Sequence, residues 1–463
     1  MSMMRLSEAA RAIPAELQGE DRAFEAVSTD TRTLGPSALF VALKGERFDG
    51  HTFLEQAAQR HAAGALVEKS GIGVRATAGN LPLLIVEDSR LALGKLAASW
   101  RSRFSMPLVA LTGSNGKTTV KEMLASILRA ASAEDAVLAT RGNLNNDIGV
   151  PLTLLELQPG HRYAVIEMGM NHAGEIRYLT RLAAPDVALV NNAAAAHIEF
   201  FGSIEGIARA KGEIFEGLAP GGTAVINADD DHAGMWRELA SGRRIVDFGL
   251  SGSAVVSATY RLRWLESEIA LKTPLGEARA VLKAPGLHNV RNALAASAAA
   301  VALQVPAQAI ARGLERYAGV KGRLQQKAGL NGATLIDDTY NANPASARAA
   351  IAVLAQAPGE TLLVLGDMGE LGAGAADLHA EIGRFAREQG VGRLFALGEH
   401  SAHAARGFGS GARHFERIED LVAEAERALA PGVTALIKGS RFMQMERVVK
   451  RFERAQQPGA GGA

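Results

Sequence analysis

The densest group of residues able to bind a phosphate lies near residue 113. The segment Leu108–Thr112 reads as a buried strand, and Gly113, Gly116 and Lys117 follow it. Apolar residues then recur at helical spacing from Val120, so a helix begins where the loop ends. A helix start offers unpaired N–H groups and the positive end of a dipole, glycines let the backbone wrap phosphate oxygens, and lysine adds a positive charge. The pattern predicts a phosphate-binding loop.

The spacing departs from the common phosphate loop, because Leu111 stands where that pattern has a glycine. A glycine-rich turn between a strand and a helix, with no ligand, is the alternative. The strand, glycines, Lys-Thr pair and helix occur in the right order, which favours a phosphate loop. The fingerprint G-x-G-x-x-G does not occur in the sequence, which disfavours a dinucleotide-dependent oxidoreductase.

Polar residues near predicted strand ends could bind a metal ion. Glu167 lies in the apolar strand 164–168, where a carboxylate is costly unless it is paired or bound to metal. Mg²⁺ accompanies nucleoside triphosphates and takes oxygen ligands, so Glu167 and the Thr118 hydroxyl are candidate ligands. A glutamate that faces solvent is an equal alternative. His197 follows the strand 187–191, and a hydrogen-bonded structural histidine is the commoner role for such a residue.

A lysine interrupts the apolar face of a predicted helix near residue 210. Ile204 and Ile207 start an apolar stripe, and Lys211 falls on its next position. A buried ammonium is unfavourable, so this side chain should be paired, deprotonated or modified. A lysine that extends its amine to solvent at a domain edge is the alternative.

The elements that must position these residues alternate between apolar runs and amphipathic segments, which predicts parallel sheets with crossover helices. At about 150 residues per domain, 463 residues suggest about three domains. We expect an α/β chain: a small mixed α/β domain at 1–87, a central domain at 88–317 with a mostly parallel sheet and helices on both faces, and a Rossmann-like α/β domain at 318–463. Expected strands are 38–43, 108–112, 164–168, 187–191, 224–227, 245–248, 334–337, 362–365, 394–397 and 435–437, with antiparallel strands in 255–282 and a helix at 52–63.

Composition excludes several classes of protein. Lys plus Arg is 50 and Asp plus Glu is 49, so the chain is not a basic nucleic-acid-binding surface overall. The absence of cysteine excludes disulfide scaffolds, thiolate catalysis and cysteine-ligated metal sites. The N-terminus lacks a signal-peptide pattern, and no apolar run approaches the ~20 residues of a membrane span. We therefore expect a soluble cytoplasmic protein.

Taken together, these residues resemble the Mur ligase family, ATP-dependent enzymes that form amide bonds in peptidoglycan synthesis. The segment 112–119 is similar to the family's variant phosphate loop, which accounts for Leu111. Segments 286–292 and 337–344 resemble its G-x-H-N-x-x-N helix and its D-[DS]-Y-x-x-N-P loop. The resemblance implies that Asn292 contacts adenine, that Arg323 reaches the γ-phosphate and that Asp338 approaches the ribose. The implied ATP-binding residues are Gly113, Ser114, Asn115, Gly116, Lys117, Thr118, Thr119, Asn292, Arg323 and Asp338.

The resemblance also implies the catalytic and metal-binding sets. The lysine at position 211 is typically carbamylated in the family, which would turn a buried cation into an anionic group. A pair of Mg²⁺ ions would accompany ATP. The implied catalytic residues are Lys117, His197, Lys211 and Arg323, and the implied metal ligands are Thr118, Glu167, His197 and carbamylated Lys211.

Further segments resemble the family's substrate-binding loops. Segments 28–32 and 39–51 are similar to a uridine-nucleotide-binding domain, 141–151 to a loop for a UDP-sugar peptide, and 340–344 to a loop of the C-terminal domain. By itself 28–32 is an ordinary polar turn and 341–344 a common turn sequence; their value lies in occurring together and in family order. The implied substrate-binding residues are Ser28, Thr29, Asp30, Thr31, Arg32, Lys44, Phe48, Asp49, Gly50, His51, Asn143, Asn146, Tyr340, Asn341 and Asn343.

The implied reaction joins D-alanyl-D-alanine to a UDP-linked muramoyl tripeptide through an acyl phosphate. The expected partners are these small molecules and ATP, with no nucleic acid, no membrane insertion and a monomeric chain. Another amide ligase, such as one of folylpolyglutamate type, is an alternative that lacks a uridine-binding first domain. A P-loop phosphotransferase or a nucleotide-switch protein without ligation is an alternative of a different class.

Overall fold

The computed structural model describes residues 2–46, 48–70, 79–194 and 201–454. Its contacts divide the chain into two compact units that are discontinuous in sequence. The first unit comprises Met1–Leu111, Ser132–Ala188 and Glu213–Ala224. The second unit comprises Thr112–Ala131, Leu189–Gly212 and Val225–Ala463.

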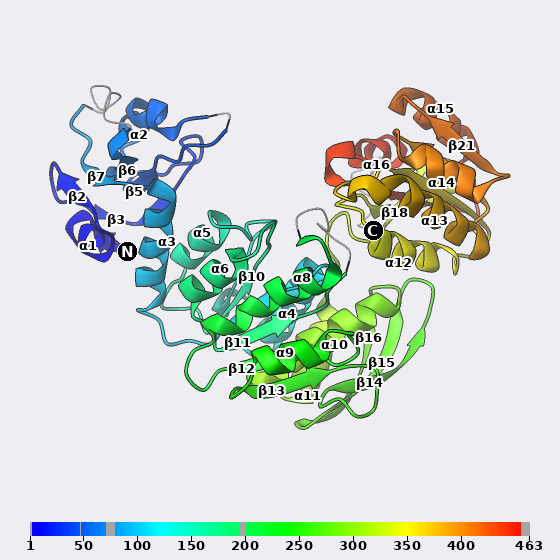
Figure 1. Cartoon of the computed structure of the whole chain (residues 1–463), viewed down its shortest axis with the longest axis horizontal. Helices are drawn as coiled ribbons and strands as arrows, with labels where there is room; N and C mark the ends of the chain where they lie inside the picture. The colour runs from blue at the N-terminus through cyan, green and yellow to red at the C-terminus, as the bar shows by residue number, and fades with distance from the viewer. Residues whose placement is uncertain (1, 47, 71–78, 195–200, 455–463) are drawn as a thin grey trace, which may run out of the picture. The chain divides into compact units, whose positions relative to one another are not determined.

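A five-stranded sheet forms the N-terminal part of the chain (Figure 1). Its elements are β1 (Met4–Arg5), α1 (Leu6–Ala12), β2 (Glu16–Gln18), β3 (Ala23–Phe24), β4 (Ala26–Ser28), β5 (Ala38–Val41), the 3-10 turn η1 (Gly50–Phe53), α2 (Leu54–Gln59), β6 (Gly64–Glu68), β7 (Leu83–Val86) and α3 (Ser89–Arg101). The sheet has the order β2-β7-β6-β5-β4, with β4 to β7 parallel and β2 antiparallel, while β1 pairs with β3. The helix expected at 52–63 is shorter, because Asp49 caps η1 and α2 ends before His61, whose φ is 60°.

The central sheet has six strands in the order β13-β12-β11-β8-β10-β9. Its elements are β8 (Leu108–Thr112), α4 (Lys117–Ala131), η3 (Glu134–Ala136), β9 (Val137–Ala139), α5 (Gly149–Leu155), β10 (Tyr163–Glu167), α6 (Glu175–Ala183), β11 (Val187–Val190), α8 (Ile204–Gly212), η4 (Glu213–Gly217), β12 (Thr223–Asn227), α9 (Ala233–Leu239) and β13 (Arg244–Phe248). Strand β8 pairs in parallel with β10, and β10 with β9. The strands expected here are confirmed, because buried parallel strands read as continuous apolar runs.

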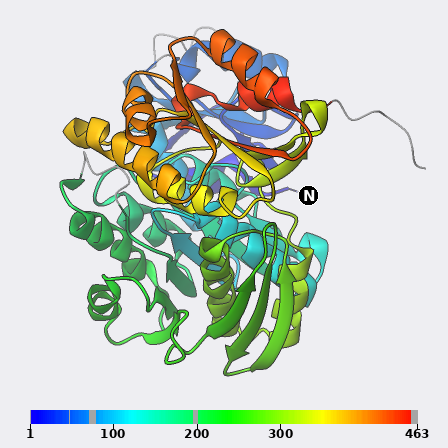
Figure 2. The same cartoon turned by 90° about the vertical axis from the view of Figure 1, so that its right-hand side faces the viewer.

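An antiparallel sheet follows, as the alternation in 255–282 predicts (Figure 2). It contains β14 (Ser257–Leu262), β15 (Ser267–Thr273) and β16 (Gly276–Leu282), and two helices follow it, α10 (Leu287–Ala302) and α11 (Ala307–Arg316). Helix α10 contacts β14 and β15, and α11 contacts β16. Both helices also pack against α4, so this part of the second unit supports the helix that follows the phosphate loop.

The C-terminal sheet has the order β17-β18-β22-β19-β20-β21 and is parallel except for β17. Its elements are β17 (Gln325–Ala328), η5 (Leu330–Gly332), β18 (Thr334–Asp338), α12 (Pro344–Leu354), β19 (Glu360–Gly366), η6 (Gly372–Gly374), α13 (Ala375–Glu388), β20 (Arg393–Leu397), α14 (Ser401–Phe408), β21 (Ala412–Phe415), α15 (Ile418–Ala428), β22 (Val433–Lys438), η7 (Arg441–Met443) and α16 (Glu446–Phe452). Side chains that alternate along the strands pack into two separate apolar cores. One core includes α12, α13 and α14, and the other includes α15 and α16. Both faces of this sheet are therefore covered, as a Rossmann-like fold requires.

Each sheet falls within one of the three expected domain ranges, while the boundaries at 87 and 317 remain a prediction. Among the residues that the structure describes, no helix combines the length and the apolar character needed to cross a bilayer.

Candidate active site

The glycine loop connects a buried strand to a helix that starts at the predicted lysine. Every residue of β8 is buried, and α4 begins at Lys117. Gly116 has φ 79°, a conformation that side chains disfavour. The Lys117 amine donates to the Gly113 carbonyl oxygen at 2.8 Å. The loop thus has the strand–turn–helix context that phosphate binding requires.

Two asparagines that follow β11 hold this loop. The Asn115 N–H donates to Asn192 Oδ1 at 2.9 Å. The Asn115 carbonyl oxygen accepts hydrogen bonds from Asn191 Nδ2 at 2.9 Å and from Asn192 Nδ2 at 3.1 Å. Asn191 Nδ2 also donates to Asn292 Oδ1 at 3.0 Å. The predicted adenine contact Asn292 is therefore linked directly to the support of the loop, and its role toward adenine stays a prediction.

Arg323 lies beside the hydroxyl of Thr118. Its Nη2 donates to Thr118 Oγ1 at 3.0 Å, and its guanidinium carbon lies 4.4 Å from the centre of the Tyr340 ring. Arg323 is separated from Thr118 by 205 residues in sequence. The second unit therefore brings together the predicted γ-phosphate contact and a predicted metal ligand.

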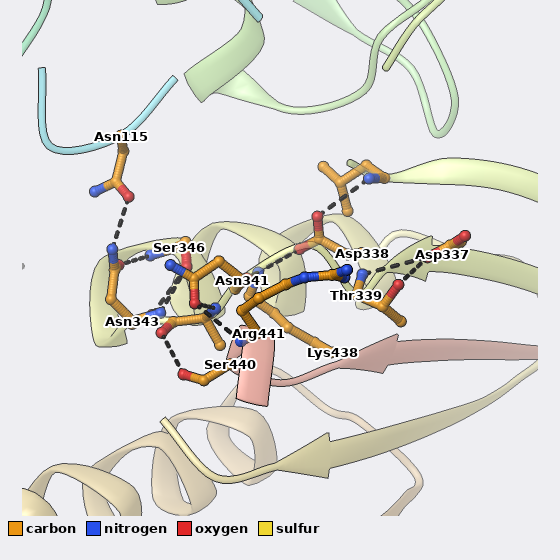
Figure 3. A network of polar contacts seen from close by, with 12 residues as sticks. Asn115, Asp337, Asp338, Thr339, Asn341, Asn343, Ser346, Lys438, Ser440 and Arg441 are labelled. Carbon is orange, nitrogen blue, oxygen red and sulfur yellow. Dashed lines mark hydrogen bonds and ion pairs between the residues drawn. The ribbon is translucent and has the colours of Figure 1, made fainter. Parts of the chain in front are cut away.

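A buried ion pair lies where two neighbouring parallel strands end (Figure 3). Lys438 donates to Asp338 Oδ2 at 2.6 Å and to the Asn341 carbonyl oxygen at 2.9 Å. Burial raises the pKa of the Asp338 carboxyl, and the attraction of Lys438 opposes that rise. Asp338 also accepts a hydrogen bond from the Leu324 N–H at 3.2 Å, next to Arg323. The predicted ribose contact is thus held by its own protein neighbours.

The loop after β18 carries the predicted substrate-binding asparagines (Figure 3). Asn343 caps α12, since its Oδ1 accepts from the Ser346 N–H at 2.9 Å, and its Nδ2 donates to Asn115 Oδ1 at 2.8 Å. Asn341 Oδ1 accepts from the N–H groups of Ala342 at 2.9 Å and Arg441 at 3.4 Å. These side chains shape the loop, and their contacts with substrate stay a prediction.

Lys211 is buried, as its place on the helical stripe predicts. Its side chain is 3% exposed. Burial lowers the pKa of the Lys211 amine well below its usual value, and the charge of Lys117 lowers it further. A lowered pKa favours the neutral amine, which is the form that can react with carbon dioxide to give a carbamate. The geometry is compatible with that modification.

Glu167 has a carboxylate oxygen to which none of the described residues donates a hydrogen bond. The residue is 2% exposed. It ends β10 and lies opposite Leu111 of the parallel strand β8, which leads into the phosphate loop. Glu167 Oε1 accepts from Asn145 Nδ2 at 2.8 Å. Its Oε2 has no hydrogen-bond partner among the described residues. A buried carboxylate oxygen of this kind suits a cation, so Glu167 fits magnesium. The other predicted ligand, His197, lies outside the described residues.

In the N-terminal sheet, the predicted uridine-binding segments follow two adjacent parallel strands, β4 and β5. Arg32 makes a two-point ion pair with Asp30, with N–O distances of 2.9 and 2.7 Å. Hydrogen bonds from Arg32 lower the pKa of the Asp30 carboxyl to about 2. Ser28 Oγ accepts from the Asp30 N–H at 3.2 Å, and Thr31 Oγ1 donates to Gln56 Oε1 at 3.1 Å. The turn around Thr29 is therefore fixed by its own side chains.

The second of these segments is a tight hairpin ending at a buried histidine. The Gly50 N–H donates to the Leu43 carbonyl oxygen at 2.8 Å, and a Cβ at Gly50 would lie 2.7 Å from the Leu43 nitrogen. His51 Nδ1 contacts Asp49 Oδ1 at 2.6 Å, and His51 Nε2 accepts from the Glu68 N–H at 2.9 Å. Both ring nitrogens of His51 are thus used within the protein, so it positions the hairpin. Lys44 and Phe48 are exposed.

In the loop 141–151, Asn143 is exposed and Asn146 lies just before α5. Asn146 Oδ1 accepts from the Gly149 N–H at 2.9 Å. Between them, Asn145 bonds Glu167. Sequence reasoning missed Asn191 and Asn192. It placed Asn145 and Lys438 in segments that resemble the family but assigned no role to either. The only signal for Asn191 and Asn192 is a polar pair directly after an apolar strand.

Three family models match the chain. The Mur ligase middle domain matches residues 111–300, the glutamate ligase domain of Mur ligases matches 322–441, and the Mur ligase family catalytic domain matches 23–101. A curated UDP-N-acetylmuramoyl-tripeptide--D-alanyl-D-alanine ligase of Escherichia coli (strain K12) is 44% identical, over 98% of this chain and 99% of the relative.

Solved structures agree with this similarity. A crystal structure of MurF from Acinetobacter baumannii is 37% identical with a TM-score of 0.89, covering 96% of this chain and 98% of that chain. The MurF ligase of Thermotoga maritima in complex with ADP is 26% identical with a TM-score of 0.79, covering 92% of this chain and 96% of that chain.

Proposed function

The chain belongs to the Mur ligase family, and we propose that it uses ATP to join D-alanyl-D-alanine to a UDP-N-acetylmuramoyl-tripeptide. The product is the UDP-muramoyl-pentapeptide used in peptidoglycan synthesis. The relatives that carry this activity match the chain over almost its whole length.

One observation in the structure supports ATP chemistry most directly. In the second unit, Lys117 starts the helix after the glycine loop, and Arg323 donates to the Thr118 hydroxyl in the same turn. Two fixed cations at the start of the helix that follows the glycine loop suit a transferring phosphoryl group, on which negative charge is spread over several oxygens.

The reaction follows from the poor reactivity of a carboxylate toward an amine. A carboxylate oxygen of the tripeptide attacks the γ-phosphorus of ATP, the bond to the β–γ bridging oxygen breaks, and ADP leaves. The dipeptide amine then attacks the acyl carbon, the bond to phosphate breaks, and the nitrogen releases a proton. Lys117 and Arg323 stabilise charge in the first step, and the loop orients the phosphates.

Magnesium would be held by Thr118, Glu167, His197 and Lys211 as its carbamate. The ion would neutralise phosphate charge when bound. The oxygen-rich donor set and the unpaired Oε2 of Glu167 support this assignment.

Substrate binding divides among the expected domains. Residues 1–87 would bind the uridine nucleotide, 88–317 would bind ATP, and 318–463 would bind both ATP and the dipeptide. The turn around Asp30 and the hairpin ending at His51 follow adjacent strands, which supports one nucleotide site at that edge. We also propose that the protein acts in the cytoplasm, as a monomer, on small molecules and without nucleic acid.

A coupled assay of ADP release tests the proposal. ADP should appear only when ATP, the UDP-tripeptide and D-alanyl-D-alanine are all present, and the pentapeptide should form in equal amount. Lys117→Ala should abolish release. ATP hydrolysis that ignores both other substrates would favour a nucleotide switch, and ligation of glutamate to a folate would favour the folylpolyglutamate type.

A further inference from the structure

The backbone of Asn115, in the phosphate loop, is held by two asparagine side chains. Its carbonyl oxygen accepts from Asn191 Nδ2 and Asn192 Nδ2, and its N–H donates to Asn192 Oδ1. A phosphate loop must turn its N–H groups toward the anion, and a carbonyl oxygen that faced the anion would repel it. Donors on this carbonyl therefore fix the orientation of the peptide that precedes Gly116.

One of these donors belongs to a longer chain of amides. Asn191 Nδ2 has two hydrogens, and it donates both to Asn115 O and to Asn292 Oδ1. Asn292 Nδ2 donates to Asn289 Oδ1 at 3.2 Å, and Asn289 Nδ2 donates to the Pro285 carbonyl oxygen at 2.8 Å. This series of hydrogen-bonded amides runs from Pro285, just before the N-cap of α10, to Asn115 in the phosphate loop.

The amide chain is buried and touches the loop closely. Asn191, Asn289 and Asn292 are 2%, 6% and 5% exposed. A Cβ at Gly116 would lie 2.8 Å from Asn191 Nδ2 and would overlap Asn292 Oδ1. The loop backbone therefore rests directly on two of the amides, and water cannot easily replace a lost bond between them.

We propose that Asn191 is a positioning residue for phosphoryl transfer: its amide orients the Asn115 peptide and couples the phosphate loop to Asn292 of α10. The inference rests on the proposed binding of ATP at this loop. Loss of the Asn191 donors removes one of the two side-chain donors to Asn115 O and the link to Asn292, so the Asn115 peptide is held less firmly. A loosely held peptide weakens binding of the nucleotide phosphates and misaligns the γ-phosphate.

The test measures ADP affinity of the full-length protein by calorimetry for Asn191→Ala, Asn292→Ala and the double variant. Asn191→Asp is nearly the same shape but places an oxygen against Asn115 O and Asn292 Oδ1. Each Asn191 variant should weaken ADP binding by about tenfold or more, as expected for a buried acceptor that loses its donor. The double variant should lose less than the product of the single losses, because both remove the same hydrogen bond.

Ser297→Ala is the matched control. Ser297 is a fully buried polar residue of α10. Among the described hydrogen bonds, its hydroxyl makes one, which it donates to the Ala293 carbonyl oxygen at 2.7 Å. It should keep wild-type ADP affinity. In the ligase assay, the Asn191 variants should show a raised KM for ATP and a lowered kcat, with the KM for the UDP-tripeptide unchanged.

Three results would overturn the role of Asn191: wild-type ADP affinity in Asn191→Asp, fully independent losses in the double variant, or a fall in melting temperature with unchanged ATP kinetics. If Asn191→Ala does not fold, Asn191→Asp carries the binding test alone. The direct binding measurement separates this inference from the proposed function. A wild-type protein that binds ADP but does not join the dipeptide would contradict the function and leave the role of Asn191 measurable.

Discussion

Lys211 shows how burial prepares a single side chain for chemistry. Burial lowers the pKa of its amine, and nearby Lys117 adds to that effect. If its carbamate is the active form, Lys211→Ala should lose most ligase activity, and acetate or formate should restore part of it by replacing the anionic group. ADP release measured across a range of carboxylate concentrations checks this expectation.

The control for that experiment is Arg209→Ala on the same helix. Its side chain is 63% exposed and pairs only with Glu205 among the ion pairs described. This variant should keep its activity and should not respond to carboxylates. Absence of rescue in Lys211→Ala, with the control intact, would leave the carbamate without support.

His288 gives a prediction about pH. Burial, together with the charges of Lys438 and Arg291, lowers the pKa of His288 to about 4, against about 6.5 in an unfolded chain. Between these two pH values the unfolded state binds more protons than the folded state. The contribution of neutral His288 to the free energy of unfolding is therefore fully present above about pH 6.5 and is lost as the pH falls toward 4. His288→Gln should flatten this part of the profile.

Urea midpoints at about pH 7.5 and about pH 5 test that prediction. The wild-type protein should lose more stability between the two than His288→Gln does. The idea fails if both proteins lose the same amount.

At the residue scale, the sequence predicted the burial of a candidate site residue more reliably than it predicted which groups such residues contact. The helical stripe correctly places Lys211 inside, because periodicity decides which face is buried. The internal bonds of His51 and Asn343 were not predictable, because each depends on a group brought close by folding.

At the scale of elements, two helices of the C-terminal domain approach through glycine. A Cβ at Gly383 of α13 would overlap the carbonyl oxygen of Ala404 in α14. Gly383→Ala should therefore destabilise the protein by about 1–3 kcal/mol, because a backbone atom cannot move aside cheaply. Thermal unfolding followed by calorimetry measures the effect.

Gly374→Ala is the comparison, since it lies next to α13 and its nearest neighbour would be Leu378 Cδ1 at 4.0 Å. Gly374 has φ −83°, which alanine adopts without strain. The melting temperature of the Gly374→Ala variant should stay at the wild-type value. Equal melting temperatures for the two variants would contradict close packing of α13 on α14.

Buried strands were predictable, whereas the two edge strands of the C-terminal sheet were not. Runs such as 362–365 and 435–437 are apolar throughout because helices cover both faces of the sheet. Strands β17 and β21 have the sequences Gln-Gln-Lys-Ala and Ala-Arg-His-Phe, which carry no such signal. They exist because a neighbouring strand offers hydrogen bonds, which is a property of the folded sheet.

At the scale of the whole molecule, the C-terminal domain should fold by itself. Its sheet has a closed apolar core on each face, and the bridge between Gly329 and Glu453 ties its last helix to β17. A fragment of residues 318–463 should show helical circular dichroism and one cooperative thermal transition.

A fragment that starts at Thr334 is the matched comparison, because it lacks β17 and leaves β18 at the sheet edge. It should melt at a lower temperature or remain unfolded. An unstructured 318–463 fragment would show that this domain depends on the rest of the chain.

Sequence patterns could not place distant segments together at the site. Arg323 meets Thr118 across 205 residues, and Asn191 meets Asn292 across 101. Family resemblance supplied both residues of the first pair but only Asn292 of the second. The cause is physical: such contacts are set by how α10 and the strands pack, and no local pattern encodes that packing.

The alanine-rich helix α10 lies against α4, β13, β14 and β15, and most of its residues from Asn289 to Val301 are buried. Small side chains let it approach the helix that begins at the phosphate loop. A saturation scan of its buried alanines from Ala293 to Ala300 should show a band of positions at which only glycine, alanine or serine survives selection. Bulkier alleles there would weaken nucleotide binding without altering Asn292, so harmful variants of this gene should also arise outside the motif at 286–292.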